Sequence, residues 1–237
     1  MCEDNERQAG WTREYDTLHG IHLGYSGAAP TAVTTFLDAV STQTDMADSM
    51  RVLDICCGKG RIGLHLAKRG FHVTGFDFAK PAIDTFREMA REMGVGDNVT
   101  LFEQDIAAPW DLPDRHFQAA LAVTAIENFT TDHVMAYFAD ELSRVLTDNA
   151  VVVLEFYGQN DGYYSTLERL KENREFIVHD PRNGMDFRLY TPEEVMTFLR
   201  PGFNVSAESV EHFKSVKYGA DYPRETHLLT LRRKIGG

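Results

Sequence analysis

Cysteine is scarce in this chain, and its distribution excludes two kinds of stabilising framework. Among the 237 residues there are 3 cysteines, which are Cys2, Cys56 and Cys57. An odd number with two adjacent members does not fit a set of disulfides, and without a Cys-x-x-Cys pair the sequence predicts no zinc site. The pair His19-x-x-His22 lacks the further ligands that a metal site needs. We therefore expect no metal and a reducing compartment.

Long apolar runs and an excess of positive charge are also missing. Lys and Arg number 24 against 36 Asp and Glu, so the formal net charge is -12. A surface this negative repels phosphate backbones, so we expect no nucleic-acid partner. No apolar run approaches the length that spans a membrane, and the polar start MCEDNERQ does not resemble a secretory or transit signal. We expect a soluble, cytoplasmic protein with no membrane partner.

Strand-like and helix-like patterns alternate through the first two thirds of the chain. This alternation is typical of a parallel sheet whose strands are joined by crossover helices. The sequence predicts helices over 31–43, 60–69, 81–93 and 131–147, and strands over 52–55, 72–77, 98–105, 117–123 and 150–156.

The pattern changes after residue 156. The segments REFIVHD and MDFRLY flank Asn183-Gly184, which is a strong hairpin signal. Thr191, Pro192 and Glu194 combine an N-cap, a first-turn proline and a capping-box glutamate, so a helix is predicted to begin there. FNVSAESVEHF and ETHLLTLRR are two further strands, and their short connection favours antiparallel pairing.

These patterns predict one domain over residues 1–237. We divide it into an N-terminal lid with helices (1–45), a cofactor-binding core (46–156), an inserted lid hairpin (157–190), and a C-terminal helix with antiparallel strands (191–237).

The turn after the first strand, in VLDICCGKGR, is the expected ligand site. Ligands of open parallel sheets bind beyond the carboxyl ends of the strands, where the strand order reverses. Gly58 and Gly60 let the backbone approach a ligand closely. Asp77 follows Gly58 at about the 20-residue spacing of an acid that binds ribose hydroxyls. Asp54 lies beside the turn, where it would oppose a diphosphate and suit a cation, although an aspartate there could also cap the turn.

Taken together, VLDICCGKGR, VTGFD, EQDI, FQAALAVTAIENF and RLYTPEEVMTFLRPGF resemble the class I S-adenosylmethionine-dependent methyltransferases over about residues 50–235. The resemblance implies an α/β, Rossmann-like fold. It has a seven-stranded, mostly parallel sheet with an antiparallel last strand and helices on both faces.

By the same resemblance, the cofactor is S-adenosyl-L-methionine, and each strand end has a role. The turn would hold the methionine part, Asp77 the ribose and Asp105 the adenine amine, with other contacts from the backbone and apolar side chains. The implied cofactor-binding residues are Asp54, Cys56, Gly58, Gly60, Asp77, Phe78, Asp105, Ile106 and Thr124. Cys56 departs from the family pattern, because a glycine is usual at its position, and Gln118 stands where many members have an aspartate.

Two residues are candidates for the catalytic step, in which an oxygen or nitrogen acceptor needs a base. Tyr157 follows the fifth strand and Glu127 follows the fourth. The alternative for Tyr157 is a half-buried packing aromatic, and for Glu127 a solvent-facing loop acid. His133 is expected at the surface, and His179 is either a base oriented by Asp180 or a solvated histidine.

An apolar lid is also predicted. Trp11, Tyr15 and Tyr25, with the hairpin over 174–190, would close over the cofactor and exclude water. Packing of an N-terminal helix on the sheet is the alternative interpretation of these three aromatic residues.

The resulting hypothesis is an S-adenosylmethionine-dependent methyltransferase that transfers a methyl group to O, N or C of a small molecule by in-line displacement. Three alternatives stay open. An NAD(P)-dependent oxidoreductase would fit the string Gly58-Lys59-Gly60-Arg61-Ile62-Gly63, and a non-catalytic cofactor-binding protein would fit Cys56. A methyltransferase of macromolecules is disfavoured by the net charge. The sequence leaves the acceptor and the oligomeric state open.

Titration calorimetry distinguishes the two cofactors. We predict that S-adenosylmethionine binds and that NAD does not, because Asp54 beside the turn opposes a diphosphate, whereas Asp77 fits the ribose of either cofactor. Substitution Asp77→Ala should weaken the binding of S-adenosylmethionine strongly. Unchanged affinity in that variant would remove the ribose assignment.

Overall fold

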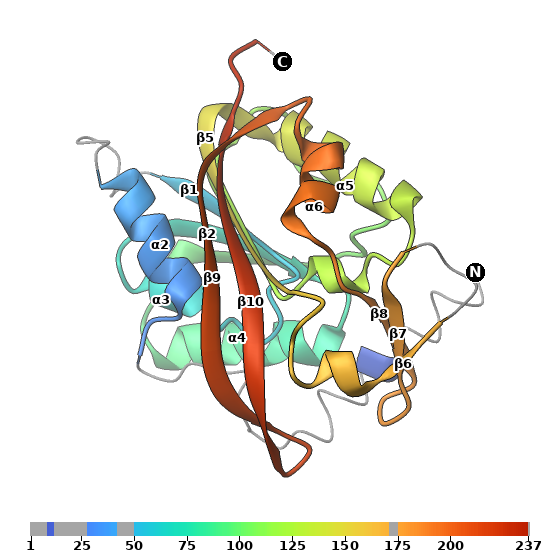
Figure 1. Ribbon diagram of the computed structural model, residues 1–237. Helices are drawn as coiled ribbons and strands as arrows, with labels where there is room; N and C mark the ends of the chain where they lie inside the picture. The colour runs from blue at the N-terminus through green and yellow to red at the C-terminus, as the bar shows by residue number, and fades with distance from the viewer. Residues whose placement is uncertain (1–8, 12–27, 42–49, 171–174, 237) are drawn as a thin grey trace.

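The computed structural model describes residues 9–11, 28–41, 50–170 and 175–236 (Figure 1). Short 3-10 turns at Gly96–Asn98, Ile126–Asn128 and Tyr164–Thr166 supplement the main elements. The labelled elements are α2 (Thr31–Val40), β1 (Arg51–Ile55), α3 (Gly63–Ala67), β2 (His72–Asp77), α4 (Lys80–Glu92), β3 (Val99–Glu103), β4 (Phe117–Val123), α5 (Asp132–Val145), β5 (Leu146–Tyr157), β6 (Glu168–Arg169), β7 (Ile177–Asp180), β8 (Met185–Arg188), α6 (Pro192–Leu199), β9 (Phe203–Lys217) and β10 (Ala220–Arg233).

The main sheet has seven strands in the order β3-β2-β1-β4-β5-β10-β9. β1 pairs in parallel with both β2 and β4, and β4 pairs in parallel with β5. β10, the last strand of the chain, runs antiparallel to β5 and to β9. The predicted seven-stranded, mostly parallel sheet is therefore confirmed. Its order reverses between β1 and β4, which places the glycine turn after β1 at the switch point.

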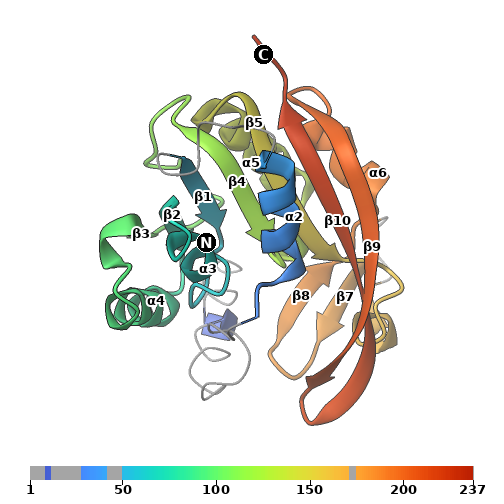
Figure 2. The ribbon, with the colours of Figure 1, turned by 90° about the vertical axis from the view of Figure 1, so that its left-hand side faces the viewer.

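Helices cover both faces of this sheet (Figure 2). On one face, α2 and α3 pack on the inward side chains of β1, β4 and β5. On the other face, α5 and α6 pack on the alternate side chains of the same strands. Because these strands are buried on both sides, they appear in the sequence as almost continuous apolar runs.

Helix boundaries follow the predicted capping residues. Thr131 caps α5 by accepting a hydrogen bond from the Val134 N–H, at 3.4 Å. Thr191 and Glu194 form the predicted capping box at the start of α6. The helix predicted over 60–69 is shorter, since α3 begins only at Gly63, after a turn in which Gly58 and Gly60 have positive φ.

The second sheet contains β6, β7 and β8, and the hairpin at Asn183-Gly184 is confirmed. Gly184 has a φ of 72°, and Asn183 Oδ1 accepts a hydrogen bond from the Met185 N–H. The two-residue strand β6 was not predicted, because it is too short to show a periodicity. The division of the chain into four regions stays a prediction.

The last two strands are longer than predicted. They extend to Lys217 and Ala220 and are joined through Tyr218 and Gly219, both at positive φ. In the outer part of this ribbon, β9 and β10 pair only with each other, beyond the end of β5. Their side chains there do not alternate between the core and solvent, so the sequence did not show the extra length of the two strands. None of the described helices is long and apolar enough to cross a membrane.

Substitution Gly63→Ala tests the packing behind the glycine turn. A Cβ at Gly63 would lie 2.5 Å from Phe86 Cζ and 3.0 Å from Asp54 Oδ2. We expect a loss of about 1–3 kcal/mol in the free energy of unfolding, measured by urea denaturation, because the added methyl group would overpack this site. Gly96→Ala is the control, since a Cβ there has its nearest contact at 3.8 Å. Equal stability of the two variants would contradict this packing argument.

Candidate active site

The glycine turn is built by backbone conformation and by a close aromatic neighbour. Cys56, Gly58 and Gly60 have φ angles of 53°, 53° and 84°. A Cβ at Gly60 would lie 2.4 Å from the ring of Phe86, which projects from α4. The ring therefore requires glycine at this point of the turn and holds the backbone in place.

Cys56 adopts the left-handed conformation, which glycine accommodates more easily than a residue with a Cβ. For a residue with a Cβ this conformation costs about 1–2 kcal/mol. The turn forms nonetheless, with Cys56 half-buried and Cys57 buried beneath it. The departure from the family pattern therefore adds strain at the turn without removing the turn.

Asp77 ties the end of β2 to the glycine turn. Its Oδ2 accepts a hydrogen bond from the Gly58 N–H at 3.0 Å, and its Oδ1 accepts one from the Ala79 N–H at 2.9 Å. Burial raises the pKa of Asp77 to about 6, although these N–H groups oppose the shift. The carboxylate thus shapes the turn. Its predicted contact with ribose stays a prediction, and Asp77→Asn tests that contact with less damage to the turn than Asp77→Ala.

Asp54 is the second buried carboxylate at this edge. Its side chain is 2% exposed, and among the described residues its Oδ2 has no hydrogen-bond partner. Burial raises its pKa to about 7, the Gly63 N–H at the start of α3 opposes the shift, and nearby Asp77 adds to it. The Asp54 carboxylate therefore faces the Gly63 N–H at the start of α3 and keeps one unpaired oxygen there.

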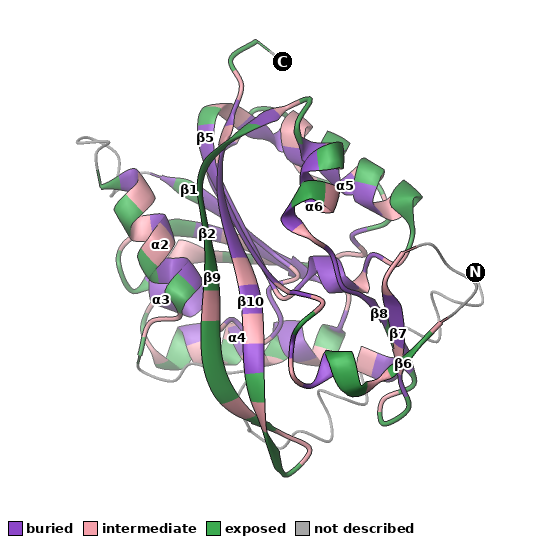
Figure 3. Cartoon of the chain, viewed as in Figure 1, coloured by how far each residue is buried: buried purple, intermediate pink, exposed green. Residues whose placement is uncertain are grey.

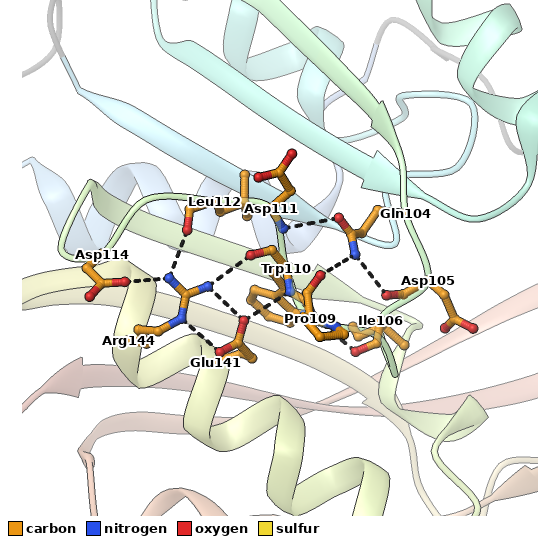
Figure 4. A network of polar contacts seen from close by, with 10 residues as sticks. All are labelled: Gln104, Asp105, Ile106, Pro109, Trp110, Asp111, Leu112, Asp114, Glu141 and Arg144. Carbon is orange, nitrogen blue, oxygen red and sulfur yellow. Dashed lines mark hydrogen bonds and ion pairs between the residues drawn. The ribbon is translucent and has the colours of Figure 1, made fainter.

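The segment after β3 is fixed by a network centred on Arg144 of α5 (Figure 4). The guanidinium donates to both carboxylate oxygens of Glu141, at 2.7 and 2.8 Å, and to the carbonyls of Leu112 and Trp110. Glu141 accepts a further hydrogen bond from the Trp110 N–H at 3.1 Å. The network fastens the loop between β3 and β4 to α5.

Asp105 and Ile106 lie at the start of that fastened loop. The Asp105 Oδ1 accepts a hydrogen bond from the Ala107 N–H, and the Ile106 carbonyl accepts one from Trp110 Nε1 at 3.1 Å. Ile106 is buried in the core, whereas Asp105 is half-buried at the surface. Their position beside β2 agrees with the predicted adenine site, and their contacts with adenine stay predictions.

Thr124 and Phe78 complete the predicted cofactor set. Thr124 has a φ of 51° at the end of β4, and its N–H donates to the Glu155 carbonyl of β5 at 2.7 Å. Phe78 follows Asp77 directly, and both Phe78 and Thr124 are half-buried. The carboxyl ends of β1, β2, β3 and β4 thus carry all nine predicted residues at one edge of the sheet.

Glu127 is not the solvent-facing loop acid that one interpretation described. It is 2% exposed, and its Oε1 accepts a hydrogen bond from the Tyr157 N–H at 2.7 Å. Within the described part of the chain, its Oε2 has no hydrogen-bond partner. Burial raises the pKa of Glu127 to about 8, the Tyr157 N–H opposes the shift, and the charges of Glu155 and Asp161 add to it.

Tyr157 is held as a packing aromatic. The guanidinium of Arg224 lies 4.2 Å from its ring centre, and the ring of Tyr164 lies 5.2 Å away. Burial raises the pKa of Tyr157 to about 12. A phenol with this pKa is a poor proton acceptor near neutral pH, whereas Glu127 is well matched.

An ion pair that no sequence pattern predicted lies beside Tyr157. Arg224 Nε donates to Asp161 Oδ2 at 2.7 Å, and both side chains are buried. Asp161 also accepts hydrogen bonds from the backbone N–H groups of Tyr163 and Tyr164. The positive charge of Arg224 is thus neutralised locally, and the partners are too far apart in sequence for a spacing argument to join them.

The histidines do not form a second site among the described residues. His179 pairs with Asp186 across the hairpin at 2.7 Å, with both side chains exposed. The proposed orientation by Asp180 is wrong, because Asp180 is buried and accepts a hydrogen bond from the Tyr163 hydroxyl. His133 is exposed, as expected. His19 and His22 lie outside the described residues.

The described residues include only part of the predicted lid. Trp11 Nε1 donates to Asn128 Oδ1 at 3.0 Å, which places residues 9–11 against the loop after β4. Trp11, Tyr157 and Tyr218 pack around the aromatic core of the second sheet. Tyr15 and Tyr25 lie outside the described residues, so closure over the cofactor stays a prediction.

A surface cavity elsewhere on the molecule is not part of this site. It is lined by Arg51, His72, Asn98 and His116, at the amino ends of the parallel strands. Cofactors of open parallel sheets bind at the opposite, carboxyl edge. The switch point, the glycine turn and the row of acids together indicate an α/β protein that binds a nucleotide cofactor.

Comparison with known proteins narrows this class. Residues 52–149 match the family described as "Methyltransferase domain". The chain is 31% identical over 123 residues to the "2-phytyl-1,4-naphtoquinone methyltransferase" of Nostoc sp., covering 49% of this chain and 51% of that protein. It is 33% identical over 92 residues to the "tRNA (uracil(54)-C(5))-methyltransferase" of Pyrococcus horikoshii, covering 36% of this chain and 22% of that protein. The chain therefore spans about half the length, or less, of these curated relatives.

A solved SAM-dependent methyltransferase from Methanosarcina mazei has the same fold. It aligns with a TM-score of 0.68 at 20% identity, over 82% of this chain and 97% of that one. Residues 52–149 are thus similar to a methyltransferase domain, and the strand order and overall fold agree with those of the solved methyltransferase.

The raised pKa of Asp54 predicts a stability difference that depends on pH. A raised pKa means that the folded state favours the protonated carboxyl. The stabilisation is present near pH 4 and is lost as the pH rises through about 7. Without cofactor, Asp54→Asn should be more stable than the wild type by about 2–4 kcal/mol at pH 8 and nearly equal at pH 4. Urea denaturation at both pH values measures this difference.

The exposed Asp140 of α5 provides the control. Asp140→Asn should change the unfolding free energy little at either pH. If Asp54→Asn were less stable than the wild type by the same amount at both pH values, the contact with Gly63 would outweigh the cost of burying the charge.

Proposed function

We propose that this protein transfers the methyl group of S-adenosylmethionine to an oxygen, nitrogen or carbon atom of a small molecule. The observation that carries the proposal is the buried Asp54 carboxylate with an unpaired oxygen at the glycine turn. In dinucleotide sites the N–H groups at the helix start bind a pyrophosphate. Here the Gly63 N–H interacts with Asp54, and a second carboxylate, Asp77, lies beside it. This arrangement favours a cofactor with positive charges.

The residues of the proposed cofactor site fit such a molecule. The backbone of Cys56, Gly58 and Gly60 would lie along its methionine part, together with the Thr124 backbone, while Asp54 would compensate its ammonium. Asp77 would accept from the ribose hydroxyls. Phe78 and Ile106 would contact the adenine, with Asp105 at its amine. When bound, S-adenosylmethionine supplies a methyl group that its positive sulfur has already activated.

We propose that Glu127 takes the proton from the substrate that receives the methyl group. Its unpaired, buried Oε2 lies at the end of β4, next to the strand end that holds Tyr157. A carboxylate with a pKa of about 8 takes a proton from a hydroxyl or an ammonium near neutral pH more readily than an exposed one. Tyr157, between Arg224 and Tyr164, supports Glu127 through its backbone N–H and forms part of the acceptor wall.

The net charge and the relatives of this chain favour a small molecule as the methyl acceptor. The chain carries a net charge of -12. That charge opposes a nucleic-acid substrate, although one relative of the methyltransferase domain is named for tRNA. Another relative is named for a naphthoquinone. We place the protein in the cytoplasm, where its cysteines stay reduced. A nicotinamide cofactor would need its diphosphate beside the buried Asp54 carboxylate. A purely binding role would not explain the buried, unpaired oxygen of Glu127.

Substitution Glu127→Gln tests the proposed base. Methyl transfer would be followed by mass spectrometry across a metabolite library, as a gain of one CH₂. We expect kcat to fall by about 10²–10⁴-fold in Glu127→Gln, because general-base catalysis is lost. In the wild type kcat should rise with pH through about 8, where Glu127 loses its proton, and in the variant this rise should vanish.

Tyr157→Phe is the matched control, since its backbone N–H still donates to Glu127. We expect it to keep the pH profile of the wild type. Calorimetry should give wild-type affinity for S-adenosylmethionine in both variants. A Tyr157→Phe variant that lost the pH dependence, beside a fully active Glu127→Gln, would transfer the role to the phenol.

A further inference from the structure

β9 is an edge strand of unusual length and exposure. It has 15 residues, and nearly all of them are exposed or half-buried (Figure 3). Its inner edge pairs with β10 along its whole length. No backbone hydrogen bond from another described segment reaches residues 207–216 from the outer side. Such an edge presents a row of free backbone donors and acceptors to another strand.

The outer part of β9 carries two lysines, which are one device that protects an edge, but it has neither a proline nor a β-bulge. The β-bulge of the ribbon lies near Ser206, and from Ala207 to Lys217 the pairing with β10 is regular. The opposite edge of the ribbon is protected, because β10 carries Pro223, whose carbonyl accepts a hydrogen bond from the Gly162 N–H at 2.9 Å. The contrast singles out the outer edge of β9 as the open one.

Three exposed apolar side chains mark this open segment at equal intervals. Val210 is 44% exposed, Phe213 is 41% exposed and Val216 is 57% exposed. They are symmetric about Phe213. If a second β9 lay antiparallel with a two-fold axis at Phe213, Val210 would face the partner's Val216, and the two Phe213 rings would meet at the axis. Residues opposite each other in this register lie on the same face of the sheet, as antiparallel pairing requires.

The charges on β9 have the same antiparallel complementarity. Glu208 and Glu211 lie before Phe213, whereas Lys214 and Lys217 lie after it. Two strands paired antiparallel bring the acidic half of each next to the basic half of the other. A parallel arrangement would bring like charges together, which is unfavourable.

We propose that two copies of this chain associate through β9, in antiparallel register about a two-fold axis at Phe213, so that the main sheet continues from one copy into the other. The contact is isologous, so each favourable pair occurs twice. Residues 209–217 of each strand pair in this register, which is at the small end of specific interfaces. We therefore expect a reversible dimer with a dissociation constant in the micromolar range, on the order of 10 µM.

Sedimentation velocity of the full chain, from about 2 to about 200 µM, tests this association across the expected range. We expect a shift from monomer to dimer. Val210→Lys should raise the dissociation constant at least about tenfold, because in each copy the new lysine lies opposite the partner's Val216 and beside the partner's Lys214. Val205→Lys is the matched control. It changes the same residue type on the same strand at 45% exposure, outside the paired segment, and should leave the dimer unchanged.

Disulfide trapping tests the register. In a Cys2→Ser background, Phe213→Cys brings two cysteines together at the axis, so mild oxidation should give a covalent dimer. Ser209→Cys is the control, since its two copies would lie about 27 Å apart along the strands.

Each outcome decides the proposal. A monomer over the whole concentration range overturns it. A dimer that Val210→Lys leaves intact, or that cross-links through Ser209→Cys as readily as through Phe213→Cys, shows that another surface or register joins the copies, and this also overturns it. Dimerisation broken by Val210→Lys alone and trapped through position 213 supports it. None of these readouts depends on methyl transfer.

Discussion

The placement of two carboxylates at the switch point is the constraint on which the rest of the site depends. Asp54 and Asp77 end neighbouring parallel strands, so the sheet brings them together. Backbone N–H groups of the turn and of the helix starts hold them there. Burial then keeps their charge unfavourable until a cation is present. The sheet, the turn and the preference for a positively charged cofactor are therefore consequences of one arrangement.

That arrangement in turn restricts its neighbours. Asp77 binds the turn through the Gly58 N–H, and the ring of Phe86 lies so close to the turn that glycine is required at residues 60 and 63. Cys56 then has a positive φ in the same turn, at some cost in conformational energy. The family match and the strained cysteine are compatible, because the turn is held from several sides.

A second pair of strand ends, β4 and β5, carries different chemistry. Glu127 bridges them through the Tyr157 N–H and keeps one oxygen unpaired. Arg224, which stacks on Tyr157, is neutralised by Asp161. The site therefore has two acidic positions, which we propose for the cofactor and for the acceptor, and the carboxyl end of β4 separates them. The β9–β10 ribbon extends past this edge and supplies Arg224 from one strand while the other stays open to solvent.

The sequence by itself determined what depends on neighbouring residues. Apolar periodicity predicted the strands of the main sheet, Thr191 with Glu194 predicted the start of α6, and the glycines with Asp54 and Asp77 predicted the turn. It did not determine the burial of Glu127, the Asp161–Arg224 pair, or the partner of His179. The tertiary structure decided these, together with the edge of β9 that no other described strand pairs with. Desolvation and ion pairing depend on segments that meet only after folding, and no local pattern records which segments will meet.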